Sequence, residues 1–173
     1  MNFKRIIFYI FFGSILLFIQ LSSIFNRIMS IRNVMPDLIL VSIILLFQIA
    51  DDYEVLIYSF ICGFLLDVFS GNLAGLNALT FSVISALLFK FKSLLYMKTL
   101  PFYLLLTLLS LFIKLFIYYI FGYIFKEIFT LYSATLLSYG IHILYTLVIV
   151  PFLYIIITIP PVINLLSKKM YEK

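Results

Sequence analysis

The sequence predicts an all-α membrane protein, a polytopic bundle of about six transmembrane helices folded as a single integral domain. Composition is the first reason. Hydrophobic residues make up 65% of the 173 residues and charged residues 11%, whereas a soluble domain has about 45–50% and about 25%. Mean hydropathy is +1.24, so there are too few polar side chains to cover a surface that faces water. The apolar residues also fall into about six runs, several close to the ~20 residues that a helix needs to cross a bilayer.

Short polar or basic segments separate these runs. The first run follows two basic residues, is longer than the apolar core of a signal peptide and lacks a cleavage site after it, so we expect an uncleaved helix. Pro36 and Asp37 open the second helix, because prolines and acidic residues favour helix starts. Pro160 and Pro161 end the last helix before a basic tail over residues 160–173. The expected helices cover residues 6–25, 37–50, 55–69, 76–89, 100–125 and 130–159.

Three of these helices, residues 37–50, 55–69 and 76–89, are short for full spans. At ~1.5 Å per residue each covers only ~21–23 Å of a hydrocarbon core of ~30 Å. Two interpretations stay open from the sequence. The helices extend into their turns, or they form a partly re-entrant layer that is buried in protein.

Basic residues lie at the ends of the apolar runs, which favours a membrane topology over a surface for nucleic acid. Six spans put both termini on one side, and a cytoplasmic placement leaves few basic residues outside. It puts Lys4, Arg5, Lys90, Lys92, Lys98, Lys168, Lys169 and Lys173 inside, and Arg27, Arg32 and Lys126 outside. We therefore expect cytoplasmic N- and C-termini, basic segments that contact anionic membrane lipids, and no nucleic-acid partner.

Small and polar residues recur at four-residue spacing in the helix predicted over residues 55–69. Ser59, Gly63 and Asp67 share one face of this helix, and Gly71 extends it. Such faces allow close approach of backbones and hydrogen bonds between helices in lipid. The face is either an internal packing seam, which is the more common use, or a groove for a partner helix.

Two ionisable residues lie inside expected helices. Counted from the cytoplasmic helix ends, Asp67 is about 18 Å deep and Lys114 about 24 Å deep, so we hypothesise that they form a buried ion pair. Charged residues in membranes usually pair with one another. In the alternative, Lys114 reaches to the interface and Asp67 accepts hydrogen bonds from the turn amides of Gly71 and Asn72.

The chain carries no motif of a catalytic, cofactor or metal site. HExxH, GxSxG, a glycine-rich phosphate loop and CxxC are all missing from the sequence, so we expect no enzyme activity, no cofactor and no metal. Cys62 and His142 each stand alone and are interpreted as structural residues. The acidic segment over residues 51–54 is a weak metal candidate, because consecutive side chains point in different directions, and we expect a solvated cytoplasmic turn.

Three motifs follow one another in the predicted second to fourth helices. They are Met35-Pro36-Asp37-Leu38-Ile39-Leu40, Gly63-Phe64-Leu65-Leu66-Asp67-Val68-Phe69-Ser70-Gly71 and Leu73-Ala74-Gly75-Leu76-Asn77-Ala78-Leu79. In this order and spacing they resemble the rod shape-determining protein MreD family. In that family a Pro-Asp pair opens a helix, a Gly-x-x-x-Asp helix runs into a Ser/Gly turn, and Gly-Leu-x-Ala-Leu starts the next helix. The resemblance assigns architecture and partner docking to the motif positions Pro36, Asp37, Gly63, Asp67, Gly71 and Gly75.

The resemblance implies a non-enzymatic scaffold of the cell-elongation machinery in the bacterial inner membrane. The implied partners are the bitopic protein MreC most directly, then the MreB filament, a RodA-type glycosyltransferase and a class B penicillin-binding transpeptidase. The implied fold is similar to the six-helix substrate-binding components of energy-coupling-factor transporters. That likeness leaves a second function open, a small-solute (vitamin-type) binding subunit of a transporter, which needs a cavity with converging hydrogen-bonding groups.

Overall fold

The computed structural model describes residues 3–22, 27, 30, 34–47, 49–71, 74–92, 99–124, 136–159 and 162. Within these ranges the chain forms six α-helices, so the predicted all-α fold is confirmed. Their bounds are α1 Phe3–Leu21, α3 Leu38–Phe47, α4 Asp52–Ser70, α5 Leu76–Lys90, α6 Leu100–Ile124 and α7 Leu136–Thr158. Of the residues used for the predicted topology and turns, Arg32, Asn72, Lys98, Lys126, Pro160, Pro161, Lys168, Lys169 and Lys173 lie outside the described residues.

Three of the described segments are long and apolar enough to cross a bilayer. They are α4, α6 and residues Ser138–Thr158 of α7. The apolar part of α1, the whole of α3 and the whole of α5 are shorter. The predicted helical membrane bundle therefore combines long and short helices.

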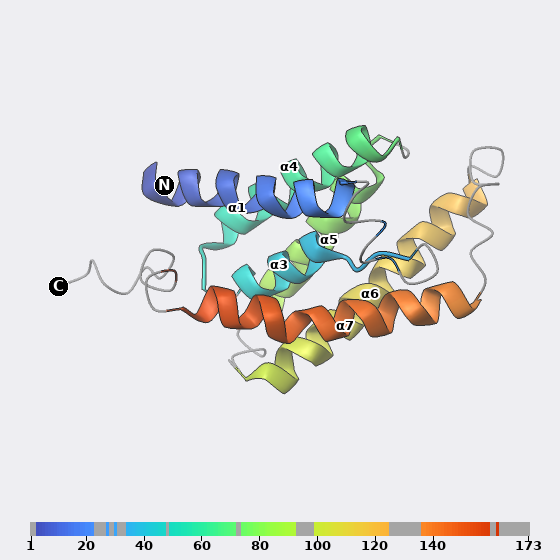
Figure 1. Ribbon diagram of the computed structural model, residues 1–173. Helices are drawn as coiled ribbons and strands as arrows, with labels where there is room; N and C mark the ends of the chain where they lie inside the picture. Colours follow the sequence, from blue (N-terminus) through green and yellow to red (C-terminus); the bar gives the residue numbers. More distant parts are fainter. Residues whose placement is uncertain are drawn as a thin grey trace.

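α3 is the central helix of the bundle and contacts α1, α4, α5, α6 and α7 (Figure 1). All ten of its residues are buried. A helix that is apolar on every side belongs in the interior of a bundle, and the α3 sequence LILVSIILLF has one polar residue. At ~1.5 Å per residue α3 is about 15 Å long, half the thickness of a bilayer core. Since Asp37 and Leu38 are buried, α3 begins inside the bundle.

α4 and α5 make the most extensive helix–helix contact among the described residues. A Cβ atom at Gly63 would lie only 2.7 Å from the backbone of Ala78, so glycine is required for this close approach. One turn away, the hydroxyl oxygens of Ser59 and Ser85 lie 3.1 Å apart. Ser59, Gly63 and Asp67 are all buried. The small and polar face of α4 is therefore an internal packing seam against α5.

The helices give the bundle two distinct ends. At the Arg5 end α1, α4 and α6 begin, while α3, α5 and α7 finish. At the opposite end, here called the Asp67 end, α1, α4 and α6 finish, while α5 and α7 begin. Because α3 is about half as long as its neighbours, it reaches from the Arg5 end only to the middle of the bundle.

The acidic turn at the Arg5 end is partly buried, which corrects the expectation of a solvated turn. Arg5 lies 2.9 Å from Asp51 and 3.6 Å from Glu54. Only 7% of Glu54 is exposed, because α1 packs against α4 at this point. Asp52 stays near the surface, where it pairs with Lys92 at 2.6 Å.

Candidate functional site

The start of α3 is the first part of the site, because a helix that begins inside a membrane protein needs partners for its free amides. Three side chains provide them. The amide of Ile39 donates to Gln20 Oε1 on α1 at 3.3 Å, and the amide of Leu40 donates to Asp37 Oδ1 at 3.2 Å. The amide of Asp37 donates to Thr146 Oγ1 on α7 at 3.2 Å. Asp37 is thus the N-cap of α3, a position that favours aspartate.

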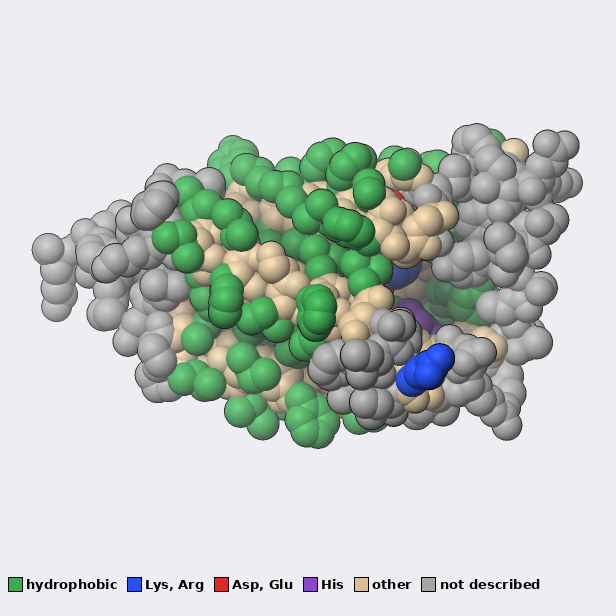
Figure 2. Space-filling view, turned by 45° about the horizontal axis from the view of Figure 1, so that its top comes forward, with side chains coloured by type: hydrophobic (Ala, Val, Ile, Leu, Met, Phe, Trp, Pro, Cys, Tyr) green, Lys and Arg blue, Asp and Glu red, His purple; other side chains and the backbone are tan. Residues whose placement is uncertain are grey.

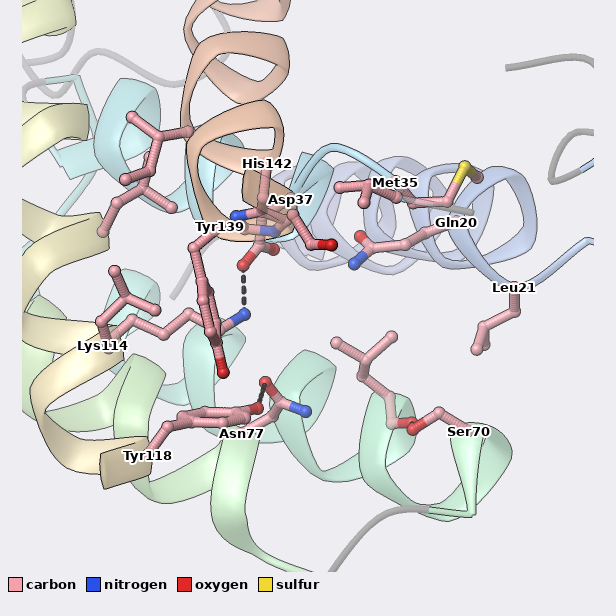
Figure 3. A pocket seen from close by; sticks show the side chains of 16 residues that line it. Gln20, Leu21, Met35, Asp37, Ser70, Asn77, Lys114, Tyr118, Tyr139 and His142 are labelled. Atoms are coloured by element: carbon pink, nitrogen blue, oxygen red, sulfur yellow. Dashed lines mark hydrogen bonds and ion pairs between the residues drawn. The ribbon is translucent and has the colours of Figure 1, made fainter. Parts of the chain in front are cut away.

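Lys114 on α6 forms an ion pair with this same aspartate. Its Nζ donates to Asp37 Oδ2 (Figure 3), and it also lies 5.1 Å from the ring centre of Phe81 and 5.4 Å from that of Tyr118. This geometry corrects the hypothesised Asp67–Lys114 pair, because the carboxylate that Lys114 meets is Asp37. The reason is topological: α3 lies against α6 and brings its capping carboxylate to the lysine.

Asp67 has a different role, at the start of α5. Its carboxylate accepts hydrogen bonds from the amides of Gly75 at 3.0 Å, Asn77 at 2.9 Å and Ala78 at 3.2 Å. These amides belong to the first turn of α5 and to its N-cap, so an aspartate on α4 caps the neighbouring helix. Only 1% of Asp67 is exposed. The alternative predicted hydrogen bonds from the amides of Gly71 and Asn72 to this carboxylate. Asn72 lies outside the described residues, and the hydrogen bonds that the structure shows come from the start of α5.

A chain of side-chain hydrogen bonds connects Asp67 to α6. Asn77 Nδ2 donates to Asp67 Oδ1 at 2.8 Å, and the Tyr118 hydroxyl donates to Asn77 Oδ1 at 2.7 Å (Figure 3). Tyr118 in turn lies beside the Lys114 ammonium. Satisfied polar networks of this kind favour one arrangement of the helices around them, since every member loses its partner when the helices move.

The remaining motif residues shape the backbone around these caps. Gly71 ends α4 with φ 69°, and Gly75 begins α5 with φ 96°. Both values lie in the left-handed region that glycine adopts without a steric penalty. Pro36 is buried next to the Asp37 cap. In the structure, all six motif positions therefore lie at helix ends or at the α4–α5 contact.

A cavity of about 530 Å³ lies at the Asp67 end of the bundle. Its position follows from the length of α3: the cavity lies beyond the start of this half-length helix, where a full-length helix would continue. Figure 2 shows the hollow beside hydrophobic side chains, with a basic and a histidine side chain visible in it. Its lining residues are Gln20, Leu21, Val34, Met35, Asp37, Leu66, Ser70, Asn77, Leu111, Lys114, Leu115, Tyr118, Ser138, Tyr139, His142 and Ile143.

His142 lies in the wall of this cavity, close to Asp37 (Figure 3). Its backbone carbonyl accepts a hydrogen bond from Thr146 Oγ1 at 2.7 Å. Its half-buried imidazole forms no hydrogen bond with any residue that the structure describes. The interpretation of His142 as a structural residue stays a prediction.

A second hollow, the α1–α4 groove, runs along the outside of the bundle and has a volume of about 220 Å³. Its lining contains the small residues Gly13, Ser14 and Cys62. A Cβ atom at Gly13 would lie 3.0 Å from Cys62 Sγ, so the two helices approach closely here. Most of the other lining residues are aliphatic, and Tyr9, Glu54 and Tyr58 complete the lining. Ile57 and Ile61 are about half exposed, at 48% and 49%.

Four residues of the site were not assigned to it from the sequence: Gln20, Asn77, Tyr118 and Thr146. Two of them share a predicted polar helix face with residues of the site, because Tyr118 follows Lys114 by four residues and Thr146 follows His142 by four. Asn77 lies within the third motif. Gln20 carries no such signal, since only the packing of α1 against α3 brings it to the start of α3.

The fold and the site define a polytopic helical membrane protein in which buried polar residues join helix ends. A family model described as rod shape-determining protein MreD matches residues 2–169. Because this match covers nearly the whole chain, the chain belongs to the MreD family, and this membership implies a role in rod shape determination. No curated protein and no solved structure matches the chain. The likeness to energy-coupling-factor components stays a prediction.

Proposed function

We propose that the protein is a non-enzymatic scaffold of the cell-elongation machinery in the bacterial inner membrane, and that it docks the transmembrane helix of MreC. Membership of the MreD family supports the cellular role. The buried charges support a scaffold, because Asp37, Lys114 and Asp67 bind helix ends or one another. MreB, a RodA-type glycosyltransferase and a class B penicillin-binding transpeptidase are the wider partners that we propose.

The docking surface that we propose is the α1–α4 groove. The other candidate, the face of Ser59, Gly63 and Asp67, is buried against α5 and offers no surface to a partner. In lipid, apolar area alone does not bring helices together, whereas small residues allow the close packing that does. Gly13, Ser14 and Cys62 supply that property. The presence of these small residues in a mostly apolar groove is the observation that carries the proposal.

The proposed orientation puts the Arg5 end in the cytoplasm, following the distribution of basic residues. The groove lining on α1 extends from Ile6 to Leu17, about 16 Å at ~1.5 Å per residue. A single transmembrane helix of MreC would therefore contact it over about half of the hydrocarbon core. Cysteine labelling of Ser30→Cys and Lys92→Cys in intact cells tests the orientation. Only the first variant is expected to react with an impermeant reagent, and the reverse pattern would contradict the proposed topology.

Filling the groove tests the docking proposal. Ser14→Phe places a ring in the groove, and its matched control, Val148→Phe, places the same ring on α7, where Val148 is 58% exposed. Both variants are expressed with tagged MreC and extracted in mild detergent. We expect MreC to co-purify with the wild type and with the control, and at least about tenfold less with Ser14→Phe. Equal recovery with both variants would exclude this groove as the docking site.

A second candidate function is a small-solute binding subunit, and the specific observation in its favour is the 530 Å³ cavity. This volume lies within the range of about 300–1,000 Å³ that is usual for small-molecule sites. A thermal-shift screen of the purified protein with vitamins tests it. Stabilisation by a vitamin would support the transporter function, and a screen without any stabilisation would count against it.

A further inference from the structure

The charged groups around the large cavity are unequally exposed. Lys114 and Asp37 form one ion pair in its wall, but 15% of the lysine side chain is accessible and only 1% of the aspartate side chain. The other carboxylate nearby, Asp67, is also 1% exposed and is taken up by the amides of α5. In the cavity, the ammonium group is therefore partly exposed, whereas both carboxylates are buried.

Other residues of the cavity wall add hydrogen-bonding groups to this cation. His142 on α7 lines the cavity, and no described residue forms a hydrogen bond with its imidazole. Tyr139, one turn earlier on α7, and Gln20 on α1 also face the cavity (Figure 3). An ammonium group beside a histidine and an amide is a combination that suits an anion rich in hydrogen-bond acceptors.

Most of the other lining residues are apolar. Seven of the lining residues are apolar: Leu21, Val34, Met35, Leu66, Leu111, Leu115 and Ile143. Figure 2 shows that the hollow opens to the outside of the bundle, beside hydrophobic surface. A ligand with a charged group alone would leave this aliphatic part of the wall without a partner.

We infer that the cavity binds an anionic amphiphile, with its phosphate or carboxylate group at Lys114 and His142 and its aliphatic part against the leucines and Ile143. Two sources can supply this chemistry: the headgroup of an anionic lipid that enters from the membrane, and a small soluble organic anion. This inference uses the cavity that favours the second candidate function and does not depend on MreC docking at the α1–α4 groove.

Two variants remove the proposed anion contacts with little change to the fold. His142→Leu removes the imidazole, with which no described residue forms a hydrogen bond. The double variant Asp37→Asn/Lys114→Met removes both charges of the ion pair together and keeps an N-cap, since asparagine caps helices as well as aspartate does. Leu144→Phe is the matched control on α7, because Leu144 is 67% exposed and does not line the cavity.

The experiment has one arm for each source of the anion. For the lipid, protein reconstituted in vesicles of phosphatidylethanolamine and phosphatidylglycerol is re-extracted, and retained lipid is measured by native mass spectrometry, with phosphatidylethanolamine and phosphatidylcholine vesicles as the comparison. For the soluble anion, thermal unfolding in neutral detergent is followed with sodium hexanoate, which carries both a carboxylate and an aliphatic chain. Loss of a hydrogen bond to a charged group weakens binding about tenfold or more.

We expect the wild type and Leu144→Phe to retain phosphatidylglycerol or to be stabilised by a soluble anion, and both cavity variants to lose that effect about tenfold. Retained lipid identifies the membrane as the source, and stabilisation without retained lipid identifies a soluble anion. An inert wild type, or equal binding by the cavity variants, would overturn the inference. MreC co-purification with His142→Leu is expected to stay normal, so failure of this site and failure of the docking proposal are distinguishable.

Discussion

The carboxylate of Asp67 accepts two hydrogen bonds from Asn77, one from the backbone amide at 2.9 Å and one from the side-chain amide at 2.8 Å. The two residues lie on different helices, α4 and α5. Gly63, one turn before the aspartate, allows these helices to approach within backbone contact. The Gly-x-x-x-Asp motif therefore connects α4 to α5. The glycine sets the distance between the two helices, and the aspartate fixes where α5 begins.

Removal of the Asp67 carboxylate should destabilise the protein strongly. Asp67→Ala leaves the amides of Gly75, Asn77 and Ala78 without their acceptor, and each unsatisfied buried donor costs ~1–3 kcal/mol. We expect the free energy of unfolding to fall by about 3 kcal/mol or more, and by about half as much with Asp67→Asn, which keeps one acceptor oxygen. Denaturant titration in detergent measures both changes.

The control for this prediction is Asp52→Ala at the Arg5 end. Asp52 is half exposed in its pair with Lys92, and surface pairs contribute at most about 1 kcal/mol. A loss with Asp67→Ala that is no larger than the loss with Asp52→Ala would show that the carboxylate does not stabilise the start of α5.

Gly63 and Gly140 should respond in opposite ways to alanine. At Gly63 the new methyl group would lie 2.7 Å from the Ala78 backbone, and overpacking of this kind costs ~1–3 kcal/mol. At Gly140 on α7 no atom lies within 4 Å of the added Cβ, so alanine should be neutral or stabilise the helix by up to about 1 kcal/mol. The midpoint of thermal unfolding compares the two variants. Equal shifts would mean that the α4–α5 distance is not limited by this glycine.

The sequence predicted those features that depend on local spacing. Four-residue spacing put Ser59, Gly63 and Asp67 on one face, and all three are buried in the structure. The apolar runs predicted the helical bundle, and α3, which is buried on every side, lies at the centre of the described helices. These features are set by periodicity and by the avoidance of polar groups in lipid.

The partner of Lys114 could not be predicted in the same way. Asp37 and Asp67 both lie within reach of the lysine when depth is counted along the helices, so residue count does not choose between them. The choice depends on which helix lies next to α6 and on which carboxylate is already used by helix amides. The neighbour of α6 and the use of each carboxylate are properties of the packed bundle, which local spacing does not predict. The cavity is a third such property, because it results from the position at which α3 begins.

The Asp37–Lys114 pair should show strong coupling in a double-mutant cycle. Lys114→Met leaves the Asp37 carboxylate buried and unpaired, and the loss of one partner of a buried pair costs ~3–5 kcal/mol. In Asp37→Asn/Lys114→Met no charge is left unpaired and the α3 cap is kept, so most of the loss should be recovered. Unfolding free energies of the two single variants and the double variant measure the coupling. Additive losses would mean that the two side chains do not stabilise each other.

The ion pairs of Arg5 with Asp51 and Glu54 should contribute more to stability than the Lys92–Asp52 pair at the same end. Arg5 is almost buried, with 8% of its side chain exposed, and it faces Glu54, with 6% exposed, while the Tyr9 hydroxyl donates to the same glutamate at 2.9 Å. Arg5→Met removes the cation and leaves Glu54 with the tyrosine, so we expect a loss of about 3 kcal/mol. Lys92→Met breaks a pair whose members are 31% and 51% exposed and should cost less than about 1 kcal/mol.

Chemical denaturation of both variants at one ionic strength compares the two losses of stability. Higher salt should reduce only the Lys92 effect, because exposed pairs are screened and buried ones are not. If the two losses were the same, burial by α1 would not strengthen the Arg5 pair.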